Sequence, residues 1–129
     1  MMLLRLWRNL SGTTAIEFAL TAPVFFLLVF GIVEAGRLMW TQVALQHGVE
    51  MAARCASLKT ADNPNPCPGA SIEAYAAAQT LGLQPPLSVF TVATTACGAE
   101  VSAAYTYNVV TTALGTPSLS LSARSCVPN

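Results

Sequence analysis

Charged side chains are scarce in this chain, and patterns typical of catalysis are missing from it. Of 129 residues, 9% are Asp, Glu, Lys or Arg, against about 25% in an average soluble domain. The formal net charge is zero and the basic residues form no cluster, so we expect no nucleic-acid partner. No nucleophile elbow, phosphate-binding glycine loop or metal-ligand spacing occurs. The sequence therefore predicts a protein that is not an enzyme and that uses no cofactor or metal.

One long apolar run stands out against this background. It contains no charged residue from Phe18 to Val33, and over about residues 15–36 it reaches the roughly 20 residues that a membrane-spanning helix needs. Pro23 lies within it and is predicted to kink the helix, because proline removes one backbone hydrogen bond. Arg5 and Arg8 precede the run, so the positive-inside rule places residues 1–12 in the cytoplasm and the rest of the chain outside.

A single carboxylate, that of Glu17, stands at the entrance of the apolar run. An acidic residue costs roughly 2.5–3.5 kcal/mol at the centre of a spanning helix and less toward its ends, so it is functional by default. Gly12 lies five residues before Glu17, and the aromatic Phe18 follows it. This spacing, after a basic segment and before an apolar span, is typical of a prepilin processing site.

The segment from Gly12 through Arg54 resembles the TadE-like family, which comprises minor pilins and pseudopilins of tight-adherence pili. The resemblance implies that a prepilin peptidase cuts after Gly12, so that Thr13 becomes the first residue, Glu17 the fifth and Phe18 the sixth. It is carried by Ala15-Ile16-Glu17-Phe18-Ala19-Leu20, by Ala22-Pro23, by Gly31-Ile32-Val33-Glu34-Ala35-Gly36-Arg37 and by Ala52-Ala53-Arg54-Cys55-Ala56.

The same resemblance implies how the chain is recognised and assembled. Glu17 and Phe18 would contribute to recognition, and the Glu17 carboxylate would pair with the N-terminal ammonium of Thr13 in a neighbouring subunit. Two opposite charges that enter a low-dielectric environment neutralise each other and fix the register of packing. Glu34 and Arg37, one helical turn apart, form either an ion pair within the chain or a candidate pair at an interface between subunits.

The partners and location follow from the resemblance as well. We expect the prepilin peptidase, other pilin subunits, the pilus assembly platform of the inner membrane and the lipid bilayer as partners. The protein would cross the inner (cytoplasmic) membrane once, or enter the surface pilus, and would take part in pilus assembly and hence in surface adhesion.

The helix is predicted to continue beyond the membrane to about Leu58, where the proline-rich segment 63–69 follows. This gives a leader of residues 1–12, a helix of residues 13–58 and an extracytoplasmic head of residues 59–129. Glu50 and Arg54 have the favourable order for an i, i+4 ion pair. One helix face carries apolar and small residues at spacings of three and four: Leu38, Thr41, Leu45, Gly48, Ala52 and Cys55.

The head has the pattern of a short helix followed by strands, which makes the fold class α+β. Residues 71–81 begin with a candidate cap, Ser71, and contain good helix formers before Gly82. Residues 88–94, 99–112 and 118–125 are predicted strands, and their alternation of apolar and polar residues favours a three-stranded antiparallel sheet packed on a helix.

Four cysteines, all on the expected outer side, indicate two disulfides in a small exported head. Four cysteines allow three pairings. We favour Cys55–Cys67, which would join the helix end to the proline-rich loop, and Cys97–Cys126, which would join the strand region to the C-terminal segment.

Two alternatives to the pilin interpretation stay open from the sequence. The first is an uncleaved, signal-anchored envelope protein whose extracytoplasmic head binds a partner. The second is a secreted domain released after an ordinary signal peptide, although Glu17 would interrupt the apolar core of such a peptide.

Overall fold

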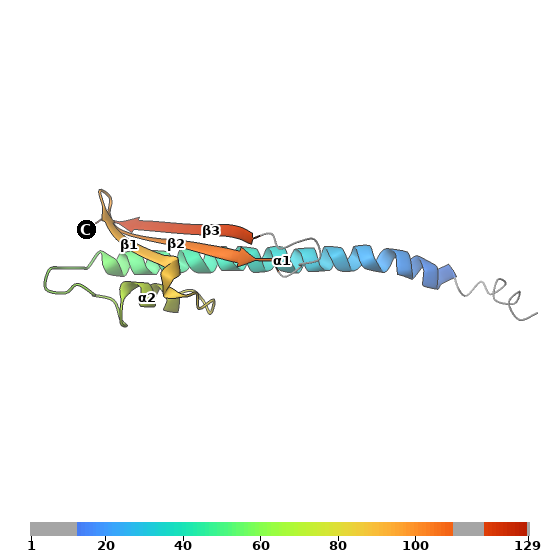
Figure 1. Cartoon of the computed structure of the whole chain (residues 1–129), viewed down its shortest axis with the longest axis horizontal. Helices are drawn as coiled ribbons and strands as arrows, with labels where there is room; N and C mark the ends of the chain where they lie inside the picture. The colour runs from blue at the N-terminus through green and yellow to red at the C-terminus, as the bar shows by residue number, and fades with distance from the viewer. Residues whose placement is uncertain (1–12, 110–117, 129) are drawn as a thin grey trace, which may run out of the picture. The chain divides into compact units, whose positions relative to one another are not determined.

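The computed structural model describes residues 13–109 and 118–128 and has the predicted α+β fold (Figure 1). The chain forms two compact units, Met1–Ala35 and Gly36–Asn129, so the C-terminal part of the first helix belongs to the same unit as the sheet. The elements are α1 (Thr13–Ala56), α2 (Ile72–Ala78), the 3₁₀ turn η3 (Leu87–Val89), β1 (Phe90–Thr95), β2 (Gly98–Asn108) and β3 (Ser118–Val127).

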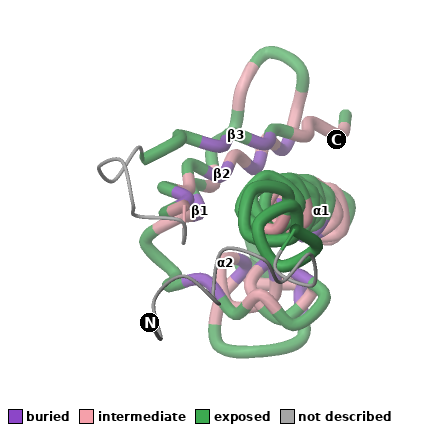
Figure 2. Tube along the Cα trace, turned by 90° about the vertical axis from the view of Figure 1, so that its right-hand side faces the viewer, coloured by how far each residue is buried: buried purple, intermediate pink, exposed green. Residues whose placement is uncertain are grey.

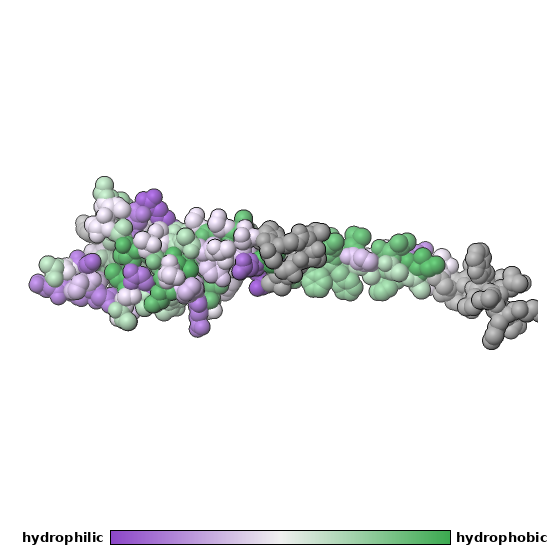
Figure 3. All heavy atoms as spheres, viewed as in Figure 1, coloured by the Kyte–Doolittle hydropathy of each residue, from purple (hydrophilic) through white to green (hydrophobic). Residues whose placement is uncertain are grey.

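In the first unit, α1 exposes apolar side chains all around its circumference. Only Ala22, Val29 and Glu34 are half-buried between residues 13 and 35, and the rest are exposed. On the face drawn in Figure 3, the described part of this unit is covered mainly by hydrophobic residues. The helix continues through Pro23, and the kink expected there stays a prediction.

In the second unit, α1 lies along one face of the sheet, and α2 lies beside both α1 and β1 (Figures 1 and 2). The predicted inner face is confirmed, because Thr41, Leu45, Gly48 and Ala52 are buried, while Leu38 and Cys55 are half-buried against the core. The predicted end at Leu58 is wrong by two residues. Beyond Ala56 the amides of Leu58 and Lys59 bond three residues back, which tightens the chain into a turn.

The second helix begins as predicted and ends earlier than predicted. Ser71 caps it, since its side chain accepts a hydrogen bond from the amide of Ala74 at 3.1 Å. The helix ends at Ala78 rather than at Leu81: Gln79 is its C-cap, and Leu81, with a left-handed φ of 51°, lies outside it.

The three strands form an antiparallel meander in the order β1-β2-β3. Side chains of alternating residues point toward α1: Val101, Ala103 and Tyr107 on β2 are buried, as are Leu121 and Ala123 on β3. The predicted bounds need correction at several ends, since β1 continues to Thr95 and β2 runs from Gly98 to Asn108. β1 begins at Phe90 because Ser88 lies in η3, and β3 continues to Val127. Residues 110–112 of the predicted second strand lie outside the described residues.

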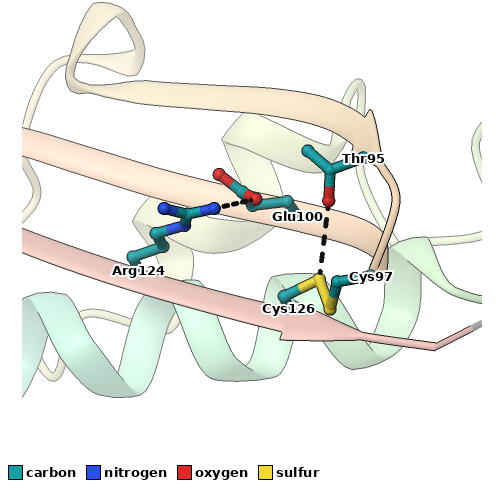
Figure 4. Close-up of a disulfide and its surroundings, with 5 residues drawn as sticks. All are labelled: Thr95, Cys97, Glu100, Arg124 and Cys126. Carbon is teal, nitrogen blue, oxygen red and sulfur yellow. Dashed lines mark hydrogen bonds and ion pairs between the residues drawn. A yellow bond between two sulfur atoms is a disulfide. The ribbon is translucent and has the colours of Figure 1, made fainter.

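Two disulfides join segments of the head, in the pairing that we favoured from the sequence. Cys55–Cys67 ties the end of α1 to the loop before α2, and Cys97–Cys126 ties the turn between β1 and β2 to the end of β3. Beside the second bridge, Arg124 of β3 forms an ion pair with Glu100 of β2 (Figure 4). A disulfide and an ion pair therefore both link β3 to the rest of the sheet near the turn between β1 and β2.

Candidate assembly site on the first helix

Glu17 is an isolated charge on a surface that is otherwise apolar. Its neighbours on α1 are strongly exposed, with 64% of Ile16 and 69% of Phe18 accessible to solvent. The next ionisable residue along the helix is Glu34. A helix that is hydrophobic all around belongs in a membrane or in the interior of a larger assembly. In either environment an unpaired carboxylate is costly, so it either pairs with an opposite charge or reaches the polar interface.

The N-terminal end of the described helix lies one turn before Glu17. Thr13 is the first residue of α1, and Thr13 and Glu17 are separated by four residues, which places them on one helix face. Gly12, the predicted cleavage position, lies outside the described residues, as does the predicted leader 1–12. The hydroxyl of Thr21 donates to the backbone carbonyl of Glu17 at 2.9 Å, so the turn after Glu17 has a side-chain as well as a backbone hydrogen bond.

The first helix is the one described helix long and apolar enough to cross a membrane by length and composition. None of the residues in its most apolar 18-residue stretch is buried within the chain. The fold thus provides an apolar anchor whose surface is left for lipid or for other polypeptides. This observation supports a contact of α1 with the lipid bilayer.

Glu34 and Arg37 follow the apolar stretch, one helical turn apart. Glu34 is half-buried and Arg37 is exposed. Arg37 also provides the backbone carbonyl that accepts a hydrogen bond from the Thr41 hydroxyl at 2.9 Å. The role of Glu34 and Arg37 as an interface pair stays a prediction.

The head contains contacts that the sequence indicated only in outline. His47 packs against the end of α2, since its Nδ1 donates to the backbone carbonyl of Gln79 at 2.8 Å. The predicted ion pair between Glu50 and Arg54 is not formed within the described part of the chain. Glu50 instead accepts a hydrogen bond from Gln46 Nε2 at 2.8 Å.

A groove beside β1 was not anticipated from the sequence. It has a volume of about 340 Å³ and lies between residues 59–61, which follow α1, and residues 92–94 of β1. The only sequence signal near it is Lys59, the single lysine of the chain. No cluster of three or more His, Cys, Asp or Glu side chains that could hold a metal ion occurs in the described ranges.

Taken together, an apolar anchor helix and a small disulfide-bonded α+β head are the features of a membrane-anchored protein. Residues 12–54 match the family model described as TadE-like protein, so the resemblance seen in the sequence is confirmed for about a third of the chain. The match indicates a protein associated with a tight-adherence pilus. Neither the curated proteins nor the solved structures that were compared gave a match.

Proposed function

We propose that the protein is a minor pilin or pseudopilin of a tight-adherence pilus. It is inserted in the inner membrane as a single-pass prepilin, with residues 1–12 in the cytoplasm and the head outside, and a prepilin peptidase cuts it after Gly12. The observation that carries this proposal is the family match over residues 12–54, within which Glu17 is the one charge on an exposed apolar surface up to Glu34.

Cleavage after Gly12 creates the charge that Glu17 needs. The new N-terminus at Thr13 carries an ammonium group, and the carboxylate of Glu17 in an adjacent subunit can neutralise it as both leave the bilayer. An uncompensated buried charge destabilises a packed interface by about 3–5 kcal/mol. Subunits shifted along the helix axis would separate these charges, so the pair selects one register.

Apolar exposure continues from the anchor into the head unit and supports packing between subunits. Met39, Trp40 and Val43 are all more than half exposed, although they belong to the unit that contains the sheet. They lie on the part of α1 that neither the sheet nor α2 covers. In an assembled pilus, helices of neighbouring subunits would cover these residues. The head itself would provide initiation contacts or surface identity, and through the pilus it would contribute to adhesion.

Two substitutions test the proposal in cells that assemble pili. Gly12→Leu should leave the full-length chain in the membrane, because the peptidase loses its cleavage residue. Glu17→Ala should reach the membrane and yet fail to support pilus assembly. Glu50→Gln is the matched control, because this carboxylate lies on the same helix but is bonded within the head. Normal pili from both test variants would contradict the proposal.

A further inference from the structure

The groove beside β1 opens at the outer edge of that strand, which α2 also approaches. Three consecutive residues of β1, 92–94, contribute to its lining. Successive side chains of a strand point to opposite faces of a sheet, so three consecutive lining residues place the mouth of the groove at the edge of β1, while Ala99 of β2 places its floor beneath the sheet. Within the described residues, β1 is an edge strand, since the sheet has the order β1-β2-β3.

The opposite wall of the groove is held in place by local bonds. Residues 59–61 form this wall, and Ala56, Ile72 and Ala99 contribute apolar side chains from α1, α2 and β2. The amide of Thr60 donates to the carbonyl of Asn63 at 3.1 Å, and the amide of Asn63 donates to the Thr60 hydroxyl at 3.0 Å. A wall ordered before binding loses little conformational freedom when a ligand enters.

We propose that this groove binds an extended peptide segment of another protein, which pairs with the edge of β1 and places a carboxylate at Lys59. Unpaired main-chain groups of an edge strand readily accept an added strand. Lys59 is the only charged residue that lines the groove, so the complementary peptide is acidic. The proposal concerns the head alone and does not depend on cleavage or on assembly through α1.

The acidic residues of the chain itself are not placed to fill the groove of a second copy. Three of the six lie on α1 and one on α2, while Glu100 lies in the central strand and is paired with Arg124. Asp62 lies in the bend next to the wall of the groove. Residues 110–117, outside the described part, contain no acidic residue. An extended acidic segment therefore comes from a different polypeptide.

The test uses the full chain in detergent micelles and fluorescein-labelled hexapeptides of alternating threonine and valine. One peptide ends in glutamate and one in glutamine, both with an amidated C-terminus. Two further peptides are the glutamate peptide N-methylated at alternate residues, one along each of its two edges. The glutamate peptide should bind saturably in fluorescence anisotropy. N-methylation along one edge should abolish binding, because it removes the main-chain donors that pair with β1.

Substitution of the lysine separates charge recognition from strand pairing. Lys59→Gln should weaken binding of the glutamate peptide about two- to fivefold, the range of an exposed ion pair, and should leave the glutamine peptide unaffected. Arg54→Gln is the matched control, since Arg54 is exposed and does not line the groove. Because the chain has a single lysine, amine-reactive labelling followed by mass spectrometry gives a second readout, in which bound peptide should protect Lys59.

Three results would overturn the proposal. The first is the absence of saturable binding of the glutamate peptide up to ~1 mM. A Kd of that size corresponds to a binding free energy of about −4 kcal/mol. The second is that both N-methylated peptides bind as tightly as the unmethylated glutamate peptide, or that the Lys59→Gln variant binds the glutamate peptide as tightly as the unsubstituted chain. The third is protection of Lys59 by rising concentrations of the chain itself without peptide, which would make the groove a contact between copies.

Discussion

Replacing Gly48 with alanine should force apart α1 and α2, the two helices of the head. A Cβ atom at this position would lie 2.8 Å from the carbonyl oxygen of Ala76 and 2.8 Å from Cγ2 of Thr80. Non-bonded carbon atoms prefer about 3.5–4.0 Å. The Ala76 oxygen belongs to the backbone of α2 and cannot rotate away, so α2 itself has to move.

The expected loss of unfolding free energy is the sum of two destabilising terms and one stabilising term. Overpacking of a core position costs about 1–3 kcal/mol. Movement of α2 also stretches the hydrogen bond from His47 to Gln79 on the adjacent turn, and a typical hydrogen bond contributes about 0.5–1.5 kcal/mol. Alanine gains about 1 kcal/mol of helix propensity over glycine. We therefore expect Gly48→Ala to lower the free energy of unfolding of the head by about 1–3 kcal/mol.

The assay is urea denaturation of the full chain in detergent, with the disulfides intact, followed by near-UV circular dichroism. Gly36→Ala is the matched control on the same helix, because its Cβ would meet nothing within 4 Å; it should be neutral or stabilising by up to about 1 kcal/mol. Thr80→Ser removes Cγ2 but keeps the hydroxyl that donates to Ala77, so Gly48→Ala should be less destabilising in that background. If Gly48→Ala were as stable as Gly36→Ala, the close approach of the helices would be refuted.

Two further predictions concern the disulfides and the core. Replacing both Cys97 and Cys126 with serine should destabilise the head by about 2–4 kcal/mol. This loss should be about 0.8 kcal/mol larger than the loss when both Cys55 and Cys67 are replaced with serine. The difference arises because the bridges span 29 and 12 residues; equal denaturation midpoints would contradict this loop-closure argument. Leu45→Ala, at a fully buried position, should lower the free energy of unfolding by about 2–5 kcal/mol, and a loss below 1 kcal/mol in the same urea titration would show that α1 is not packed in the core.

Periodic features of the sequence were sufficient to predict much of the head. The spacing from Leu38 to Cys55 identified the packed face of α1, including the glycine that lets α2 approach. Alternation predicted strands over residues 99–112 and 118–125, and the expected inner face is buried along β2 (Gly98–Asn108) and β3 (Ser118–Val127). Ser71 signalled the start of α2 because a cap is a local interaction between a side chain and a nearby amide.

Features that depend on tertiary packing could not be predicted in this way. Leu81, the predicted end of α2, lies outside the helix with a positive φ, although leucine has no intrinsic preference for that conformation. Glu50 bonds Gln46 rather than Arg54, because several i, i+4 partners of similar energy compete on a helix surface. The groove at Lys59 brings together segments more than 30 residues apart, so no local pattern marks it.

Intact-mass measurement and N-terminal sequencing test the central claim most directly. They should be applied to the protein recovered from membranes and from sheared surface material. Cleavage by a prepilin peptidase predicts a chain that starts at Thr13 and keeps the apolar residues of α1. A chain that starts at Met1 would contradict processing and favour an uncleaved anchor, and a chain that starts after the apolar run would indicate a secreted domain.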